Sequence, residues 1–416
     1  MSFPTVLPVR EQARIVNQTL AKRFERLLPA VMRETGFDAW LIIGHEDNHD
    51  PVFYTIVPME VWAPILQVVL FFDTGSEVER INLSRTNMLG LMPPSPWGPL
   101  GEKDQWQVLR EVLEQRSPQR IGINTSDVIW AADGLTASLK DRLFESLGSD
   151  LASRCESAEP LAIRWLETRL PEELELYEQA CAIAHAMIRH CFSRQAITPG
   201  VTTTEDLEWT YWQLATDLGL PLSFKPFFRL YRDERTTPAE GTNSKVIQPG
   251  DMLHCDVGVE YLRLTTDHQE LAYVLRPGET EAPEGLRRGL REANRLQDVF
   301  TQSWECGLSG NAILERALQR ADAEGISHPK IYSHSLGHLL HEPGPLMGLP
   351  WQQTAIPGRG DVVMHENTAY TVELRVDVEV PEWGGQLVAF PIEQDAAITA
   401  NGVHYIDGRQ TDLHLV

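Results

Sequence analysis

The sequence predicts two domains: an α/β domain over residues 1–160, then an α+β domain over residues 171–416 with a mainly antiparallel sheet. Over roughly the first 150 residues, helical periods alternate with short apolar runs, which is typical of α/β domains. In the second half, long helical periods come first and strand-like runs follow after residue 325. Pro160 and Pro171 indicate a linker over residues 161–175 that runs into the first helix of the second domain.

The hydrophobic period identifies each element of the first domain. Residues 14–36 repeat apolar side chains at three- and four-residue spacing and end at Gly36, which predicts a helix. The other predicted elements are short apolar strands over 38–44, 66–72 and 120–124 and helices over 103–116 and 134–148.

Long helical periods open the second domain. Residues 171–197 predict one long helix that ends at Thr198-Pro199-Gly200, and Thr202–Asp206 carries the capping signal of the next helix. The remaining predicted elements are helices over 205–218, 284–305 and 310–324 and strands around 331–340, 368–380 and 386–400.

The stretch from His254 to Asp267 is the first candidate for a functional site. Its alternation predicts a half-buried strand, with Leu253, Cys255, Val257, Val259 and Tyr261 on one side and His254, Asp256, Gly258 and Glu260 on the other. Asp267 lies far enough beyond Asp256 for a second strand to return beside the first. Two carboxylates on neighbouring strands would then converge.

Composition excludes several classes of partner. The formal net charge is −23, from 36 basic and 59 acidic residues, which argues against nucleic acid and anionic membrane surfaces. The five cysteines show no Cys-x-x-Cys spacing, so we expect reduced core residues in a reducing compartment. Neither a signal peptide nor an apolar run long enough to cross a bilayer is evident. We therefore expect a cytoplasmic protein.

Further polar candidates follow in the second half of the chain. His334, His338 and His341 lie close together in one segment, and Glu373 and Glu393 stand on the polar faces of two later strand-like runs. Any one of these side chains, taken alone, is more often a solvated residue or a satisfied buried histidine than a ligand.

The ordered set is harder to explain by solvation. Asp256, Asp267, Glu373 and Glu393 supply four carboxylates, and one histidine adds an imidazole. Such a set is too rich in oxygen for structural zinc. It suits manganese, or cobalt, zinc or iron in a carboxylate-bridged pair. Because four carboxylates without cations repel one another strongly, the ions would also allow the cluster to fold.

This pattern resembles the pita-bread metallopeptidases, which include methionine aminopeptidase, aminopeptidase P, prolidase and the related creatinase. The resemblance covers about residues 171–405. It rests on these motifs in order: Asp256-x10-Asp267, Gly337-His338, His341-Glu342-Pro343, Thr371-Val372-Glu373 and Ile392-Glu393. The first domain resembles the creatinase/prolidase-type N-terminal domain, which favours the Xaa-Pro peptidase branch.

The resemblance implies roles for the candidate residues. Asp256 would bind one of two divalent ions, and Asp267 and Glu393 would bridge both. His338 and Glu373 would complete the second ion, with Glu373 also accepting a proton from the attacking water. The two remaining histidines of the segment, His334 and His341, would contact the substrate or the tetrahedral intermediate.

The implied activity is hydrolysis of a peptide bond in short peptides, either Xaa-Pro dipeptides or N-terminal Xaa-Pro bonds, by a hydroxide that bridges two metal ions. The implied cofactors are two divalent ions, with Mn²⁺ first and Co²⁺, Zn²⁺ or Fe²⁺ as alternatives. The implied partners are a short peptide and a second copy of the chain.

The chain also departs from the Xaa-Pro pattern. No histidine lies between Tyr231 and Leu253, the usual Thr-Arg after the second aspartate is replaced by residues 268–270, and Pro391 stands where an arginine is usual. Two alternatives therefore stay open. One is a creatinase-like amidohydrolase that acts on a non-peptide C–N bond, and the other is a binding protein of the same fold that has lost activity.

Overall fold

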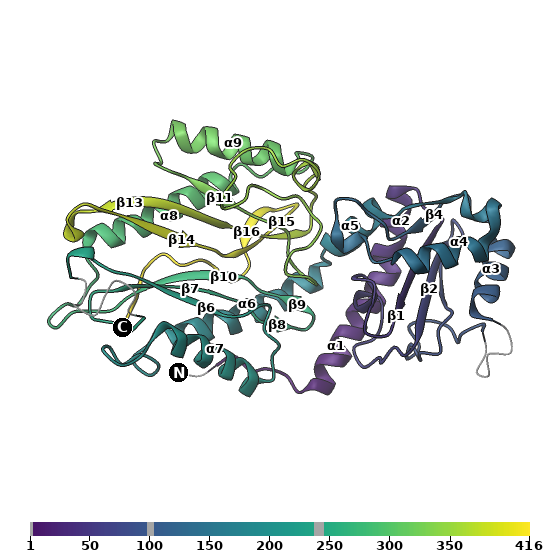
Figure 1. Ribbon diagram of the computed structural model, residues 1–416, viewed down its shortest axis with the longest axis horizontal. Helices are drawn as coiled ribbons and strands as arrows, with labels where there is room; N and C mark the ends of the chain where they lie inside the picture. Colours follow the sequence, from purple (N-terminus) through teal and green to yellow (C-terminus); the bar gives the residue numbers. More distant parts are fainter. Residues whose placement is uncertain (1–2, 98–103, 237–244) are drawn as a thin grey trace. The chain divides into compact units, whose positions relative to one another are not determined.

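The computed structural model describes residues 3–97, 104–236 and 245–416. The chain divides into two compact units, Leu7–Leu170 and Met1–Val6 together with Pro171–Val416 (Figure 1). The segment predicted as a linker, 161–175, contains the end of one helix and the start of the next. None of the described helices is long and apolar enough to span a membrane.

The unit Leu7–Leu170 is a mixed sheet with helices on both faces. Its helices are α1 Val9–Lys22, α2 Leu28–Thr35, α3 Gln105–Arg116, α4 Ala137–Ala152 and α5 Glu159–Glu167, and its strands are β1 Ala39–His45, β2 Leu66–Asp73, β3 Val78–Asn82, β4 Ile121–Ile123 and β5 Cys155–Ser157. The strand order is β3-β2-β1-β4-β5, with β1 antiparallel to β2 and parallel to β4.

The three predicted strands of this unit are confirmed, and the short strands β3 and β5 were not predicted. The helix predicted over 14–36 is longer and divided, because a π-helical turn, Arg23–Leu27, separates α1 from α2. Gly36 ends α2 in the left-handed conformation, with φ of 75°. The predicted start of the next helix, residue 103, lies outside the described residues.

Two apolar layers cover the sheet of this unit. Leu109 of α3 and Leu143 of α4 pack on one face with Leu41 and Leu70. On the other face, Trp40 and Phe71 lie 5.8 Å apart between ring centroids and contact further aromatic rings from the helices. Burial of this kind supplies most of the stability of a domain.

Asp50 is a buried carboxyl group in this unit and gives its stability a pH dependence. Asn124 Nδ2 donates to both carboxyl oxygens, at 3.0 and 2.9 Å, and Val52 N donates at 2.9 Å. Burial nevertheless raises the pKa of Asp50 to about 7. The folded chain therefore holds this proton more tightly than the unfolded chain, whose aspartate titrates near pH 4. The resulting stability is complete below pH 4 and is lost as the pH rises through 7.

We expect the thermal midpoint of the full chain to fall between pH 5 and pH 8, and to fall less in Asp50→Asn, because the variant cannot ionise there. The difference corresponds to a few kcal/mol in the free energy of unfolding. Thermal unfolding followed by circular dichroism measures it. Asp47→Asn, which changes an exposed acid of the same loop, is the control and should follow the wild type. Parallel curves for all three proteins would contradict the prediction.

The second unit is the α+β domain. Its helices are α6 Pro171–Cys191, α7 Thr204–Leu218, α8 Glu284–Thr301 and α9 Gly310–Ala323, and its strands are β6 Phe227–Tyr231, β7 Met252–Val257, β8 Glu260–Tyr261, β9 Leu264–Thr265, β10 His268–Tyr273, β11 Lys330–Tyr332, β12 Thr368–Thr371, β13 Glu373–Val380, β14 Gln386–Ile392, β15 Asp395–Thr399, β16 Gly402–Tyr405 and β17 His414–Leu415. A capping box formed by Thr203 and Asp206 begins α7, as the sequence predicts.

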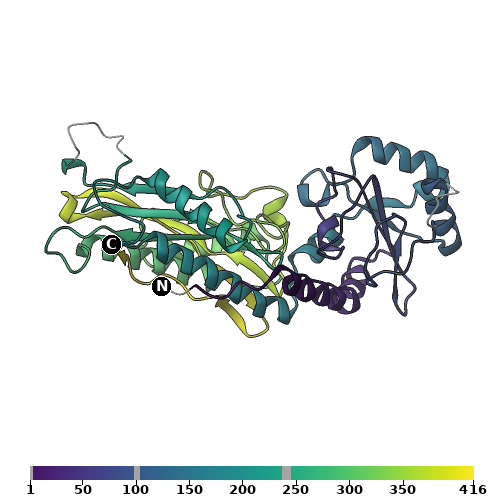
Figure 2. The same cartoon turned by 90° about the horizontal axis from the view of Figure 1, so that it is seen from below.

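The described strands of this unit form four small sheets: β17-β10-β7-β6, β11-β13-β14, β12-β15-β16 and the two-stranded β8-β9. All pairs except β10–β17 are antiparallel, which confirms the mainly antiparallel prediction. Figure 1 shows α8 and α9 on one side of the strands and α6 and α7 on the other, and Figure 2 shows the second pair from below. The core between α8 and β13–β14 includes Leu286, Leu290, Val376 and Phe390.

Three predictions for this unit are corrected. The strand from residue 253 is not half-buried, because both faces of β7 are covered and His254 is as buried as Leu253. The strand predicted over 331–340 ends at Tyr332, where the chain turns into a loop. The helix predicted over 171–197 ends at Cys191.

Candidate metal centre

Strand register brings the two aspartates to one place. Strands β7 and β10 are antiparallel, and Asp256 pairs directly with Gln269. Asp267 immediately precedes β10 and lies two residues before Gln269, so the three side chains share one face. The strands can close because Gly258 has no side chain: a Cβ there would lie 1.9 Å from the Thr266 carbonyl oxygen.

The two glutamates lie at the junctions where the chain passes from one sheet to the other, between β12 and β13 and between β14 and β15. Glu373 begins β13, one residue beyond the end of β12, and Glu393 lies between β14 and β15. Gln269 and Glu393 exchange backbone hydrogen bonds of 3.1 and 3.0 Å, which join the β10 sheet to the sheets that contain β14 and β15. The Gln269 amide also donates to Glu373 Oε1 at 2.8 Å and to Glu393 Oε2 at 2.6 Å. This one amide therefore holds both glutamates beside the aspartates.

His334 is the histidine that reaches this group. It follows β11 and is fixed by the adjacent end of β12, because Thr371 N donates to the His334 carbonyl at 3.0 Å. His334 Nε2 lies 3.7 Å from Asp267 Oδ2, and the ring is buried. Ligand atoms of Asp267, His334 and Glu393 all lie within 4.8 Å of one another.

The structure gives His338 different neighbours. Its Nδ1 lies 3.1 Å from the Arg263 carbonyl, in the turn between β8 and β9, and its Nε2 lies 3.4 Å from Glu173 Oε1 on α6. Leu262 and Arg263 both have positive φ in that turn, so this contact supports a strained backbone. His338 is thus placed to hold the hairpin to α6, whereas the sequence motif predicts a metal ligand.

His341 lies against His334. The two ring centroids are 4.3 Å apart and the rings are nearly perpendicular. His341 Nε2 is 3.4 Å from the Tyr332 hydroxyl. The structure therefore brings Asp256, Asp267, Glu373, Glu393 and His334 into one group, places His341 at its edge and leaves His338 outside it.

The electrostatics of this group call for cations. Burial, reinforced by the neighbouring acids, raises the pKa of Asp267 and of Glu393 well above their ordinary values. Burial and the charge of Asp256 likewise raise the pKa of Glu373, and burial raises the pKa of Asp256 to about 6. Burial, with His341 beside it, lowers the pKa of His334 well below its ordinary value. A neutral imidazole and carboxylates that repel one another are suited to divalent ions.

Orphaned oxygen atoms provide a direct test of that fit. Asp267 Oδ1 and Glu393 Oε1 are buried and have no hydrogen-bond partner among the described residues. Buried polar atoms normally have partners, and unpaired carboxylate oxygens are especially costly. Hard divalent ions prefer carboxylate oxygen and accept imidazole, so the residues present fit one or more such ions.

A pocket of about 280 Å³ opens beside these acids. Asp256 and Glu373 line it together with His254, Gln269, Tyr332 and Pro391, and three cationic side chains complete its wall: Arg229, Lys330 and Arg375. Arg375 is paired with Asp377 at 2.7 Å. Arg229 lies over the Phe227 ring and forms no ion pair within 4 Å in the described part of the chain, but its charge partly offsets the rise in the pKa of Asp256. The pocket therefore combines carboxylates at its base with a positive charge available to a ligand.

Three contributors were not predicted from the sequence: Gln269, Tyr332 and Arg229. The sequence does indicate Gln269, because this residue lies two positions after Asp267 on a predicted strand and its side chain therefore points to the same face. No sequence pattern indicates Arg229, because only the pairing of β6 with β7 brings this residue opposite His254.

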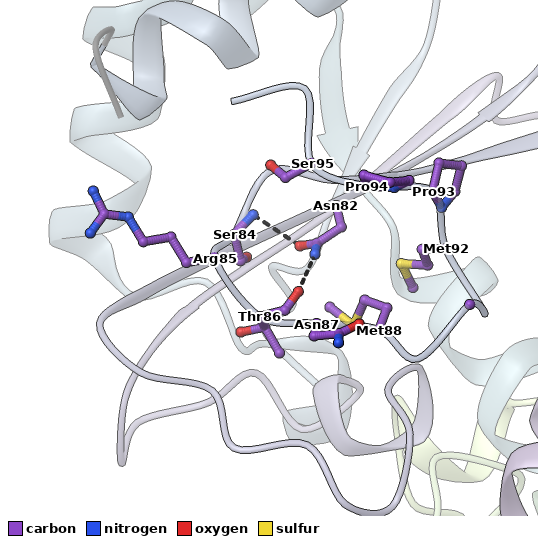
Figure 3. Close-up of a pocket in the computed structure, with 11 residues that line it drawn as sticks. Asn82, Ser84, Arg85, Thr86, Asn87, Met88, Met92, Pro93, Pro94 and Ser95 are labelled. Atoms are coloured by element: carbon purple, nitrogen blue, oxygen red, sulfur yellow. Dashed lines mark hydrogen bonds between the residues drawn. The ribbon is translucent and has the colours of Figure 1, made fainter. Parts of the chain in front are cut away.

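The unit Leu7–Leu170 has a separate hollow of about 490 Å³, which Figure 3 shows. Asn82 organises its wall by donating to the Thr86 carbonyl at 2.7 Å and accepting from Ser84 N at 2.9 Å. Its lining residues include no carboxylate, imidazole or thiol, so they offer nothing comparable to the group in the second unit.

The mainly antiparallel α+β fold and its buried carboxylate–imidazole group define a domain of the divalent-metal-binding class. The model of metallopeptidase family M24 matches residues 175–400, which is more than half of the chain. The chain belongs to this family and is a metal-dependent peptidase. None of the curated proteins matches the chain.

Several solved structures share the fold over nearly the whole chain. An X-Pro aminopeptidase from Thermotoga maritima is 16% identical, with a TM-score of 0.65, and the match covers 93% of this chain and 100% of that chain. A Xaa-Pro dipeptidase from Bacillus anthracis is 17% identical, with a TM-score of 0.59 and coverage of 97% and 100%. A prolidase from Pyrococcus horikoshii is 16% identical, with a TM-score of 0.59 and coverage of 97% and 99%. The predicted two-domain pita-bread fold, divergent from the Xaa-Pro peptidases, is confirmed.

Proposed function

We propose that this protein uses two divalent ions to hydrolyse a peptide bond in short peptides, with Xaa-Pro dipeptides or N-terminal Xaa-Pro bonds as its substrates. The observation that carries the proposal is the group of four carboxylates and one imidazole beside a small pocket, with Asp267, His334 and Glu393 buried and Asp256 and Glu373 half-buried. Manganese as the native ion, a cytoplasmic location and a homodimer belong to the same proposal.

In this proposal, the carboxylates of Asp256, Asp267, Glu373 and Glu393 and the imidazole of His334 would hold the two ions. The imidazole position goes to His334 because its Nε2, not that of His338, lies beside Asp267. When bound, the ions make a water nucleophilic at neutral pH and polarise the scissile carbonyl.

The remaining steps fall to the side chains around the pocket. Glu373 lies at the base of the pocket, where it can accept a proton from the attacking water, and the Gln269 amide fixes its carboxylate. Tyr332 lines the same pocket, and its hydroxyl is in contact with His341. We propose that Tyr332 and His341 stabilise the negative charge that develops on the carbonyl oxygen during the attack.

The pocket favours a short substrate with a free carboxylate. Its volume of about 280 Å³ limits the ligand to a few residues. The Arg229 guanidinium lies near Asp256 but forms no ion pair within 4 Å among the described residues, so it can pair with a C-terminal carboxylate. Lys330 lines the same pocket. Pro391 replaces the arginine that the Xaa-Pro pattern carries, so these cations would take over its charge.

A manganese-supplemented hydrolysis screen tests the proposal. We expect cleavage of Xaa-Pro dipeptides, about two ions per chain, loss of activity on chelation and its return with Mn²⁺. The C-terminal amide of the same dipeptide should be a poorer substrate by about tenfold or more, because it forfeits one charge-assisted pair. Xaa-Pro-Xaa tripeptides, non-proline dipeptides and creatine complete the panel.

Each other outcome removes a defined part of the proposal. Cleavage of non-proline dipeptides alone overturns the proline specificity, and cleavage of creatine alone indicates the amidohydrolase. Bound ions without any hydrolysis indicate a binding protein. Absence of bound ions after reconstitution overturns the mechanism itself.

A further inference from the structure

A second group of potential ligands lies behind the carboxylate-rich centre. Cys181 of α6, His268 at the start of β10 and Asp395 at the start of β15 come from three separate elements. All three are buried, with exposed fractions of 0%, 1% and 1%. One potential ligand atom from each lies within 4.8 Å of the other two. The fold thus brings a thiol, an imidazole and a carboxylate together in the interior.

The spacing of these atoms matches tetrahedral coordination. Cys181 Sγ lies 3.5 Å from Asp395 Oδ2, and His268 Nδ1 lies 3.8 Å from the same oxygen. A tetrahedral zinc ion, with bonds of about 2.0–2.3 Å, separates its ligand atoms by roughly 3.3–3.8 Å. Two of the three ligand-atom distances therefore have the required length, and the third, between the thiol and the imidazole, is no longer than 4.8 Å.

Unpaired polar atoms point to a missing ligand. His268 Nδ1 and Asp395 Oδ1 are both buried and have no hydrogen-bond partner within the described ranges. Asp395 Oδ2 does accept from Asp267 N at 3.3 Å, so its carboxylate is held in place by the backbone of the neighbouring centre. The Cys181 thiol also donates a hydrogen bond to Asp395 Oδ2, but His268 Nδ1 still has no partner among the described residues.

A surface pocket lies close to this group. The His185 ring lies 4.3 Å from the His268 ring, centroid to centroid. His185 in turn lines a surface pocket of about 590 Å³ together with Glu270, Asp407 and His414. The His185 side chain therefore lies between the buried group and a pocket whose wall carries three acids and two arginines.

We propose that Cys181, His268 and Asp395 form a second metal site, distinct from the carboxylate-rich centre, for a zinc-class divalent ion. One thiolate, one imidazole and one carboxylate are typical zinc ligands, and a set of three leaves a fourth position for water. Binding releases the thiol proton of Cys181 to solvent. The thiolate ligand distinguishes this site chemically from the carboxylate-rich centre, whose candidate ligands are only oxygen and nitrogen atoms.

Cobalt substitution tests the proposal without any activity assay. In reduced, metal-depleted full-length protein titrated with Co²⁺, we expect a near-ultraviolet sulfur-to-cobalt charge-transfer band, which ions bound to carboxylates alone cannot give. Cys181→Ala should abolish the band and lower the zinc content by about one ion per chain. Cys191→Ala is the matched control, since Cys191 is equally buried on the same helix and belongs to no such group among the described residues. This variant should keep both the band and the wild-type zinc content.

Asp395→Asn is a second test that leaves the thiol in place, and it should weaken the band while circular dichroism reports an intact fold. A wild-type protein without the band overturns the proposal, whatever the variants do. So does a band that persists in Cys181→Ala. In either case the Cys181–Asp395 contact is only a buried hydrogen bond, and the proposed peptidase centre is unaffected.

Discussion

Replacement of Glu393 by alanine is expected to remove peptidase activity and most of the bound manganese. Glu393 is 1% exposed, lies within 4.8 Å of the Asp267 and His334 ligand atoms, and accepts a 2.6 Å hydrogen bond from Gln269. In the proposed centre its carboxylate would help to hold the ions, so its loss would weaken their binding. A metal ligand of this kind supports several kcal/mol of transition-state stabilisation, which corresponds to a fall in kcat/KM of at least about 1,000-fold.

The measurement combines kcat/KM on a Xaa-Pro dipeptide with ion content after reconstitution. Glu379→Ala is the control, because Glu379 is an exposed glutamate on β13 and should leave both quantities unchanged. Circular dichroism distinguishes a lost ligand from an unfolded domain. If Glu393→Ala retained near wild-type activity and ion content, the carboxylate would be a structural partner of Gln269 and no ligand.

Much of the fold follows from local patterns in the sequence. The β7 and β10 strands and their two aspartates are predictable because a period of two, a turn and a return strand are all local features. The same reasoning misjudges burial. Alternation of Cys255 with His254 and Asp256 suggests one wet face, yet β6 and β10 flank β7 and both of its faces are covered. A polar face that lines a site is indistinguishable, in sequence, from one that faces water.

The identity of the clustered histidine is a different kind of problem. His334 and His338 occupy the same loop, and no local rule says which one turns inward. The answer depends on partners that are distant in the sequence. Thr371 binds the backbone of His334, whereas the His338 side chain contacts Arg263 and Glu173. The Gly337-His338 motif alone favours His338. Tertiary contacts override it because a loop without its own hydrogen-bonded ladder takes its shape from what it packs against.

His334→Ala and His338→Ala are therefore expected to differ sharply. Among the described residues, His334 is the imidazole that lies with the clustered carboxylates, because its Nε2 is 3.7 Å from Asp267. Its removal therefore takes the imidazole away from this cluster. We expect the loss of about one ion per chain and a fall in kcat/KM of at least about 100-fold, because even outer partners of metal ligands contribute 10- to 100-fold. Removal of His338 leaves the carboxylates and His334 in place, so the ion content should stay at the wild-type value.

The two variants are matched, because each removes an imidazole from the same loop and both rings are largely shielded, with side-chain exposures of 1% and 10%. His338→Ala should instead lower the thermal midpoint, since it releases the strained turn at Arg263 from α6. Isothermal titration with Mn²⁺ and thermal unfolding separate the two effects. If His338→Ala lost the ion and His334→Ala kept it, the assignment based on the sequence motif would hold, and the loop would have to rearrange when ions bind.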